Sequence, residues 1–296
     1  MAVGPSHDVW FCDTIGHSID SISPHGDVTA YPGLPGHEPA MGIVGGPDGN
    51  IWYGARGGGV VRMTPSGSST FFSIAMGIRI IAMTVGSDEN IWAIGYNLSG
   101  ACGCLVKITT SGRITIYPPQ NGSDQLLSIA TGSDGNVWYV AADLNGSTIE
   151  RATPGGVFAS FKTSARAYRI AAAKDGDMYA SLPGSGPNAD GGVLLRITPA
   201  GRINQIPGTA DMIDGMSDVT EGPDGNIWGN AYCSTAAQCL VKFDVASRRY
   251  SETKIPCAPA YVDSMLIETG SDRNVWLQPA HGTCSSDAIL EYVTGL

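Results

Sequence analysis

GPDGNIW occupies residues 46–52, and the same seven letters return at 222–228. A catalytic or phosphate-binding signature is normally needed once in a chain, whereas a structural unit is needed as often as the structure repeats. Shorter relatives of the heptapeptide occur at HDVW (7–10), DENIW (88–92), DGNVW (134–138), DGDMY (175–179) and DRNVW (272–276). The heptapeptide is therefore predicted to belong to a structural unit that the chain repeats seven times.

Every copy of this unit ends in an aromatic residue, and successive copies are 40 to 49 residues apart. All six tryptophans of the chain fall at this position, and a tyrosine fills the remaining one. The seven repeats are centred on Trp10, Trp52, Trp92, Trp138, Tyr179, Trp228 and Trp276. A period in this range with a repeated aromatic residue is typical of a β-propeller that has one blade per repeat.

The residues around the aromatic position predict the strands of each blade. Asp-Gly between apolar runs favours a tight hairpin, which places the aromatic residue on the second strand. A third strand follows, as in VVRMTPSG (60–67), and then a fourth, as in RITIYP (113–118). We therefore predict an all-β fold, a seven-bladed β-propeller with four-stranded antiparallel blades, that forms a single domain over residues 1–296.

The two ends of the chain predict an irregular last blade. MAVGP (1–5) matches only the tail of a first strand, and ILEYVTGL (289–296) reads as a third strand. The last blade is thus expected to have three strands, unless the sequence is a trimmed piece. Trimming would also account for the absence of a signal peptide at the start of the sequence.

Composition excludes several classes of partner. The formal net charge of −10 argues against a nucleic-acid partner, which needs a basic face. No apolar run approaches the roughly 18 residues of a membrane span. The chain is expected to be a monomer that binds a small molecule, a glycan or a protein at the mouth of its central channel.

The repeat resembles that of the virginiamycin B lyase (streptogramin lyase) family. WFCDTIGHSIDSI (10–22) is similar to the family pattern of Trp-Phe-Thr-Glu, four to five residues, and Ile-Gly-Arg-Ile. The resemblance extends over essentially the whole chain and implies a seven-bladed propeller. The type member of the family opens cyclic depsipeptide antibiotics by metal-assisted elimination, so the resemblance also implies a lyase.

The sequence departs from the family at the histidines that carry this activity. They lie in a Pro-His-[Gly/Ala]-Ile stretch at the start of a blade's first strand, with a glutamate nearby. Alignment on the turns that follow gives no histidine at this position, which is occupied by Met41, Ile81, Leu127, Tyr168, Ser217 and Met265. The base and the metal ligands of the lyase therefore have no counterparts here.

Three histidines are candidates for a relocated site. His17, His37 and His281 belong to blades 1, 2 and 7, on the rim that frames the mouth of the central channel, with Asp13 and Glu38 nearby. Imidazole and carboxylate groups suit acid–base catalysis or a divalent metal ion, here Mg or Ca. His17, His37, Glu38 and His281 are thus the candidate catalytic residues, and the three histidines with Asp13 are the candidate metal ligands. The alternative is that these are solvated loop residues far from one another.

A second set of charged and aromatic residues is predicted on the same rim. Acidic residues entering blades 6 and 7 are expected to oppose basic residues entering blade 5, on the far side of the channel. Together they would orient a zwitterionic or polar ligand. The predicted ligand-binding residues are Tyr96, Arg166, Tyr168, Arg169, Asp214, Asp218, Tyr261 and Asp263. Ordinary loop charge and aromatic packing are the alternatives.

The seven cysteines indicate an oxidising compartment. No Cys-x-x-Cys spacing supports a zinc site or a redox dithiol. We predict the disulfides Cys233–Cys239, within one hairpin, and Cys257–Cys284, around blade 7. Rim disulfides favour a secreted, periplasmic or cell-surface protein. Of the remaining Cys12, Cys102 and Cys104, at least one is expected to be free.

Two functions remain. In the first, the chain is a binding propeller that keeps the family scaffold without its catalytic histidines. In the second, it is a metal-assisted lyase or lactone-opening enzyme that acts on a cyclic ester or depsipeptide. Since propellers support many functions, the fold alone does not decide between them. The missing histidines favour the first.

Overall fold

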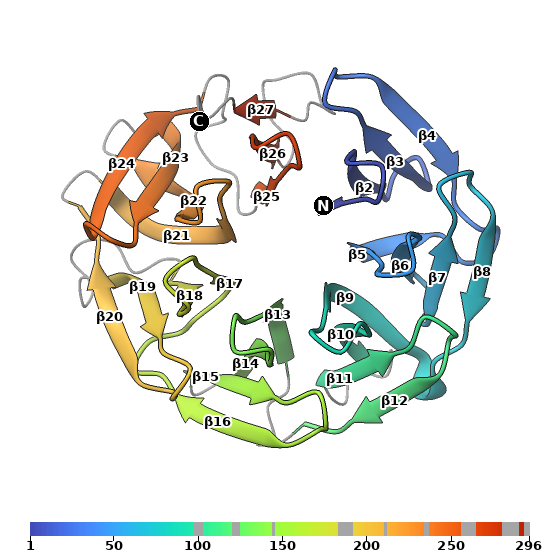
Figure 1. Ribbon diagram of the computed structural model, residues 1–296, viewed down its shortest axis with the longest axis horizontal. Helices are drawn as coiled ribbons and strands as arrows, with labels where there is room; N and C mark the ends of the chain where they lie inside the picture. Colours follow the sequence, from blue (N-terminus) through green and yellow to red (C-terminus); the bar gives the residue numbers. More distant parts are fainter. Residues whose placement is uncertain are drawn as a thin grey trace.

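The computed structural model of the chain describes residues 1–97, 103–119, 125–143, 146–182, 192–209, 212–233, 237–255, 265–279 and 290–292. These residues form seven antiparallel sheets, arranged as blades around a central axis (Figure 1). Each of the first six sheets has four strands, and their order in the sheet follows the chain from the axis outward. The seventh has three strands in the described part of the chain. The predicted seven-bladed propeller is confirmed.

The strands are short, and each blade is one repeat of the sequence. Blade 1 contains β1 (Ala2–Val3), β2 (Val9–Asp13), β3 (Ser18–Ile22) and β4 (Val28–Pro32). Blade 2 contains β5 (Pro39–Gly45), β6 (Ile51–Ala55), β7 (Val60–Met63) and β8 (Ser69–Phe72). A short 3-10 turn, η1 (Ala75–Gly77), leads into blade 3, which contains β9 (Ile78–Val85), β10 (Ile91–Asn97), β11 (Gly103–Ile108) and β12 (Ile114–Tyr117).

The second half of the chain continues in the same way. Blade 4 contains β13 (Gln125–Thr131), β14 (Val137–Asp143), β15 (Gly146–Ala152) and β16 (Phe158–Lys162). Blade 5 contains β17 (Ile170–Ala172), β18 (Met178–Ser181), β19 (Gly192–Ile197) and β20 (Ile203–Pro207). Blade 6 contains β21 (Met212–Glu221), β22 (Ile227–Cys233), β23 (Ala237–Asp244) and β24 (Arg249–Lys254). Blade 7 contains β25 (Met265–Thr269), β26 (Val275–Pro279) and β27 (Leu290–Tyr292).

The repeated heptapeptide is the turn between the first and second strands of a blade. In blade 2 the carboxylate of Asp48 accepts a hydrogen bond from Trp52 Nε1 (3.1 Å), and Gly49 adopts a positive φ of 74°. Trp52 itself is fully buried. The same bond joins aspartate and tryptophan in four further blades, at Asp88–Trp92, Asp134–Trp138, Asp224–Trp228 and Asp272–Trp276. The heptapeptide is therefore a turn held by its own aspartate.

These turns also link neighbouring blades. The hydroxyl of Ser87 donates to the carbonyl of Gly135 in the next blade (2.6 Å), and Ser133 bonds Gly176 in the same way (3.0 Å). In the last blade Ser271 donates to the carbonyl of His7 (2.6 Å), which belongs to blade 1. Because His7 and Ser271 lie near opposite ends of the chain, this bond closes the ring.

The outer part of blade 2 packs against blade 3 through a set of groups that recurs in blades 3 and 4, which we term the junction seal. In blade 2 the ring of Trp52 stacks on Phe72 (5.3 Å between centroids). Arg62 lies over Trp52 and donates from Nη1 to the carbonyl of Thr110 in blade 3 (3.0 Å). Gly112 has a positive φ and packs so close to Phe72 that a Cβ would collide with the ring. Cation, stacked rings and glycine together fill this junction.

The junction seal recurs in blades 3 and 4. There Lys107 and Arg151 reach the carbonyls of Pro154 and Pro199 in the following blades. The stacked pairs are Trp92–Tyr117 and Trp138–Phe161, and the glycines are Gly156 and Gly201. No helix in the described part of the chain has the length and apolar character needed to cross a membrane.

Candidate functional site

The inner strands of all seven blades surround a channel with a volume of about 990 Å³. Its lining is mixed: isoleucine and other apolar side chains alternate with charged groups from blades 1, 5, 6 and 7. Among the described residues the charged lining side chains are Asp13, Asp20, Arg169, Asp218, Glu221 and Glu268. Five carboxyl groups thus share the lining with one guanidinium and with Met1, whose terminal ammonium acts on Glu268 and Asp218.

Two of these charged side chains occupy a position that other blades give to small residues. The position lies four residues before the first residue of the aspartate turn, and blades 2, 3 and 4 carry Gly42, Ala82 and Ser128 there. A Cβ at Gly42 would crowd the backbone of blade 3, which explains a small residue in blade 2. Blades 5 and 6 carry Arg169 and Asp218 instead.

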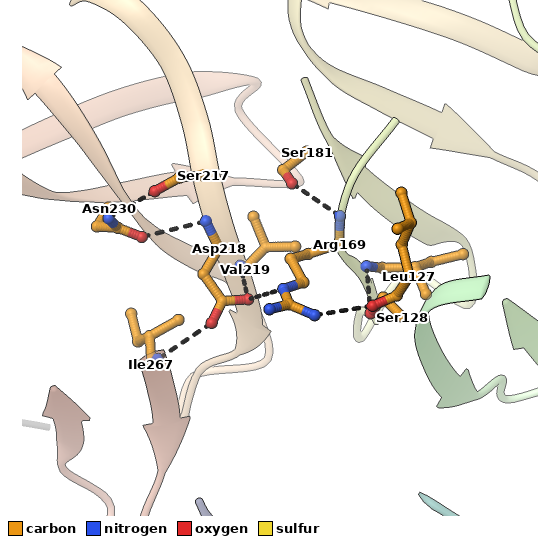
Figure 2. Close-up of polar contacts among 10 residues, drawn as sticks. Leu127, Ser128, Arg169, Ser181, Ser217, Asp218, Val219, Asn230 and Ile267 are labelled. Atoms are coloured by element: carbon orange, nitrogen blue, oxygen red, sulfur yellow. Dashed lines mark hydrogen bonds and ion pairs between the residues drawn. The ribbon is translucent and has the colours of Figure 1, made fainter. Parts of the chain in front are cut away.

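Arg169 and Asp218 form an ion pair beside the channel (Figure 2). Arg169 Nε lies 3.6 Å from Asp218 Oδ1, and Arg169 Nη1 donates to the carbonyl of Leu127 in blade 4 (2.8 Å). Asp218 also accepts from the backbone amides of Val219 (3.0 Å) and Ile267 (3.3 Å). The pair therefore connects the inner strands of blades 4, 5, 6 and 7.

Neighbouring side chains hold the backbone of this pair in place. Ser181 Oγ accepts from the amide of Arg169 (3.0 Å), and Asn230 Oδ1 accepts from the amide of Asp218 (3.1 Å). Asn230 in turn donates to Ser217 Oγ (2.7 Å). Burial raises the pKa of Asp218, although Arg169 and the two amides oppose this shift. The geometry fixes both charges at the channel wall.

Three further carboxyl groups line the channel with raised pKa values. Burial raises the pKa of Glu268 to about 7, a shift that the chain's terminal ammonium and the Thr269 amide reduce and the charge of Asp218 increases. Burial also raises the pKa of Glu221 and of Asp20. One oxygen of Asp20 is buried with no hydrogen-bond partner among the described residues. Glu268 therefore exchanges a proton near neutral pH, as ligand-binding and acid–base residues do.

These three carboxyl groups were not among the predicted site residues. Glu221 is the last residue of its inner strand, and Glu268 is the second-last residue of its own. Blades 2 to 4 carry Gly45, Val85 and Thr131 at the last position, and Val44, Thr84 and Ala130 at the second-last. The sequence does carry a signal for these glutamates. At the same aligned positions, blades 2 to 4 have only small, apolar or hydroxyl-bearing residues. This signal becomes visible once the inner strands are aligned on their turns.

The structure corrects the predicted arrangement of Arg169 and Asp218. They were expected on opposite sides of the channel, but blades 5 and 6 are neighbours, so the two side chains are in contact. Of the other residues predicted with them, Tyr168 carries the Arg169 guanidinium above its ring (5.0 Å), and Arg166 is exposed. Tyr96 is bonded to Arg79 through its hydroxyl (3.3 Å).

The remaining ligand-binding predictions cannot be placed in the same way. The backbone of Asp214 belongs to β21, and its side chain lies outside the described part of the structure. Tyr261 and Asp263 lie outside the described residues altogether. All three stay predictions.

Two of the candidate residues interact in the described part of the chain: backbone hydrogen bonds lower the pKa of Glu38, and the charge of His17 contributes to this shift. His17 lies in an exposed turn with a positive φ of 57°, and the ring of His37 stacks on Phe71 (3.6 Å between centroids). Asp13 accepts from the amides of Ile15 and Gly16, and Glu38 from that of Gly36. His281 lies outside the described residues, so the three-histidine site stays a prediction.

A divalent metal ion does not fit the side chains that can be placed. Such an ion needs several oxygen or nitrogen ligands converging on one point. Among the described residues no three His, Cys, Asp or Glu side chains are grouped in this way, and the carboxyl groups of the channel are no exception. No chemical step is therefore derived through a metal.

The structure contains a disulfide between Cys233 and Cys239, which joins β22 to β23 within one hairpin. The predicted partners Cys257 and Cys284 lie outside the described residues, as does Cys102. Cys12 is a free thiol, and Cys104 is buried. Burial raises the pKa of Cys12 to about 12, so this thiol stays protonated and unreactive at neutral pH.

Comparison with solved structures identifies propellers of the same design. Virginiamycin B lyase from Staphylococcus aureus matches with a TM-score of 0.75 at 20% identity, over 96% of this chain and 90% of that one. A streptogramin B lyase structure matches with a TM-score of 0.72 at 18% identity, over 93% and 88%. A putative 6-phosphogluconolactonase from Bacteroides uniformis matches with a TM-score of 0.61 at 11% identity, over 95% and 94%.

At these identities the solved structures show a shared fold. No protein with a curated description matches the sequence. A model of the virginiamycin B lyase family matches residues 1–187, which is more than half of the 296 residues. The chain therefore belongs to the virginiamycin B lyase family.

Proposed function

We propose that this propeller binds a small polar molecule with an ammonium or guanidinium group in its central channel. The observation that carries the proposal is the lining: five carboxyl groups and one guanidinium around about 990 Å³. The volume is that of a typical small-molecule site, in which apolar walls supply contact area and a few polar groups fix orientation. Since Arg169 is already paired with Asp218, the remaining carboxyl groups are available to a cationic ligand.

Proton exchange is part of the proposed binding. A carboxyl group with a raised pKa is partly protonated at neutral pH, and an arriving cation favours its charged form. Glu268, with a pKa of about 7, then releases a proton when the ligand binds. Affinity for a cation is accordingly expected to rise with pH, most steeply around pH 7, where free Glu268 loses its proton.

The absence of histidine at Met41, Ile81, Leu127, Tyr168, Ser217 and Met265 supports a binding role over the family's elimination reaction. We further propose that the chain works in an oxidising compartment outside the cytoplasm. The disulfide between Cys233 and Cys239 supports this location, because such bonds are rare in reducing compartments.

Calorimetric titration of the full chain with cadaverine, a small diamine, tests the proposal. Glutarate, a dicarboxylate of matching length, is the control ligand. We expect cadaverine to bind and glutarate not to bind, and cadaverine affinity to increase between about pH 5 and about pH 8. Glu268→Gln should weaken cadaverine binding about tenfold and flatten the pH dependence. Equal binding of the two ligands, or an unchanged affinity in this variant, would contradict the proposal.

The second candidate function is a lyase or lactone-opening enzyme. Glu268 favours it, because a carboxyl group with a pKa near 7 suits general acid–base catalysis. The S. aureus virginiamycin B lyase has been crystallised with quinupristin, so quinupristin is the substrate to test. Elimination would give a ring-opened product of unchanged mass, and hydrolysis would add one water. If quinupristin stays intact over prolonged incubation, the chain does not share that substrate, and the binding role is favoured.

A further inference from the structure

A hollow of about 830 Å³ lies between blades 5 and 6, on the outer side of the propeller. The outer strands β20 and β24 form its walls, whereas the inner strands surround the central channel. The two cavities share no lining residue. The hollow is therefore separate from the site described above.

At the hollow, blade 5 carries smaller side chains at both ring positions of the junction seal. Tyr179 replaces the tryptophan, and Ile206 stands five residues after the turn glycine, where blades 2, 3 and 4 carry Phe72, Tyr117 and Phe161. Both replacements remove ring volume from the same junction. Tyr179 keeps its bond to the turn through Asp175 (2.8 Å), so the turn of the blade is intact although the stacked pair of the other junctions is missing.

Blade 6 contributes the rings of Phe243 and Tyr250 to this junction but leaves the hollow open beside them. Its turn between the third and fourth strands is one residue longer than in blades 2 to 5. The amide of Arg248 donates to the carbonyl of Asp244 four residues back, whereas the corresponding bond in blade 2, from Gly67 to Thr64, spans three residues. No glycine is present in this turn; Arg248 adopts the positive φ, at 57°. Arg196, the counterpart of Arg62, bonds Asp177 within its own blade. Arg196 therefore lines the hollow but makes no bond to blade 6 among the contacts of the described residues.

The lining of the hollow is basic and aromatic. Arg196, Arg248 and Arg249 line it, and no carboxylate does among the described residues, although the chain as a whole has a net charge of −10. The ring of Phe243 lies 5.8 Å from Tyr179 and 4.9 Å from Tyr250. The hydroxyl of Tyr250 is buried with no hydrogen-bond partner among the described residues. A buried donor without an acceptor is costly, and a ligand oxygen would satisfy it.

We propose that this hollow is a binding site for a small aromatic carboxylate. The ligand's ring takes the space that tryptophan and phenylalanine fill at the other junctions, against Tyr179, Phe243 and Tyr250. Its carboxylate meets Arg248 and Arg249, which are exposed at the opening, since guanidinium groups bind carboxylates through paired hydrogen bonds. The ligand would complete a junction that the sequence leaves open.

Ligand-observed NMR on the full chain tests the proposal with naphthoate as the probe. Naphthalene methanol supplies the ring without the charge, and inorganic phosphate supplies an anion without the ring. We expect naphthoate to bind more tightly than either. Ile206→Phe, which restores the ring of the sister blades, should weaken naphthoate binding about tenfold while the melting temperature stays the same or rises. The double variant Arg248→Gln/Arg249→Gln should also weaken it about tenfold.

Two matched variants complete the experiment. Arg113→Gln removes an exposed arginine beside the filled junction of blades 2 and 3, and it should leave naphthoate binding unchanged. Glu268→Gln, in the channel, should also leave it unchanged, so the two proposed sites are tested independently. If Ile206→Phe does not fold, the exposed arginine pair still decides the result. Failure of naphthoate to bind, insensitivity to Arg248→Gln/Arg249→Gln, or phosphate binding as tight as naphthoate would each overturn the proposal.

Discussion

The junction between blades 4 and 5 and the junction between blades 5 and 6 are built from the same repeat but are filled differently. At the first, Trp138 stacks on Phe161, Arg151 crosses to the carbonyl of Pro199, and Gly201 packs on the phenylalanine ring. At the second, smaller side chains and a longer turn leave about 830 Å³ open. The two junctions nevertheless belong to one regular ring (Figure 1).

The comparison shows that the turn and the seal of a blade are separable. The turn of blade 5 keeps its internal bond, and Lys174 bonds both Gly225 and Asp224 of the next turn. The aspartate turns therefore fix the spacing of the blades, whereas the junction seal only fills the space between them. A blade can lose its seal and still hold its place in the ring.

At its inner end, the junction between blades 5 and 6 contains an ion pair. Arg169 and Asp218 belong to blades 5 and 6, the same two blades that are poorly packed at the outer end. The other described junctions show no ion pair between neighbouring inner strands. We infer that each charge of the pair needs its partner for this junction to stay stable, and the inference gives the largest expected effect.

Replacing Arg169 by methionine should destabilise the protein by about 3 kcal/mol or more, because it leaves the Asp218 carboxylate buried without its partner. Urea denaturation followed by tryptophan fluorescence measures the loss. The double variant Arg169→Met/Asp218→Ser, which copies the Ser128 of blade 4, should recover a large part of it. A double variant as unstable as the single one would show that the pair itself, and not the stranded charge, determines stability.

Gly201→Ala tests the filled junction from the glycine side. The new Cβ would collide with the ring of Phe161, and φ of +82° is strained for alanine, so we expect a loss of about 2–3 kcal/mol. Gly36 has a similar φ of +78° but open space around it. Gly36→Ala should therefore cost only about 1 kcal/mol. Thermal melts of the two variants separate the collision from the backbone strain, and equal losses would argue against the packing role of Gly201.

Phe161→Ile converts the filled junction of blade 4 into a copy of the open one. Removing part of a stacked ring should cost about 1–2 kcal/mol through lost contacts and a new cavity. The reverse change, Ile206→Phe in blade 5, should not destabilise the protein. Chemical denaturation of both variants measures the difference. If both changes destabilise equally, blade 5 has repacked around its isoleucine and the hollow is not a missing ring.

The fold was readable from the sequence because its signal is local and repeated. An aspartate four residues before a tryptophan forms the same turn wherever it occurs, so DGNIW predicts the same hairpin at Trp52 and at Trp228. Blade number, strand order and the buried aromatic positions follow from counting these turns.

The channel was less predictable because it depends on which residues share one level of the ring. Arg169 and Asp218 were selected as charged residues, but their contact requires the positions of two neighbouring blades. Glu221 and Glu268 were missed because a glutamate at a strand end looks like an exposed charge. Only the ring geometry turns both carboxyl groups toward the axis. A repeat pattern shows which residue stands at each position of a blade, but it does not show which side chains of different blades lie close together.

Blade 1 offers the smallest and most specific test, since its turn is the weakest copy of the repeat. Ser6 stands where the other blades carry the bonding aspartate, and the Nε1 of Trp10 is buried with no acceptor among the described residues. Ser6 instead donates to Asp8 (2.9 Å), in the position that blade 2 gives to Asn50. The double variant Ser6→Asp/Asp8→Asn restores the repeat and should stabilise the protein by about 1 kcal/mol, the worth of one added hydrogen bond. Ser6→Asp alone should gain less, because the new carboxylate lies beside Asp8.

Asp134→Ser in blade 4 is the opposite change, and it should destabilise by at least as much, because Asp134 also accepts from Asn136. Thermal melts that show no gain in the double variant would mean that the aspartate turn shapes the hairpin without stabilising it.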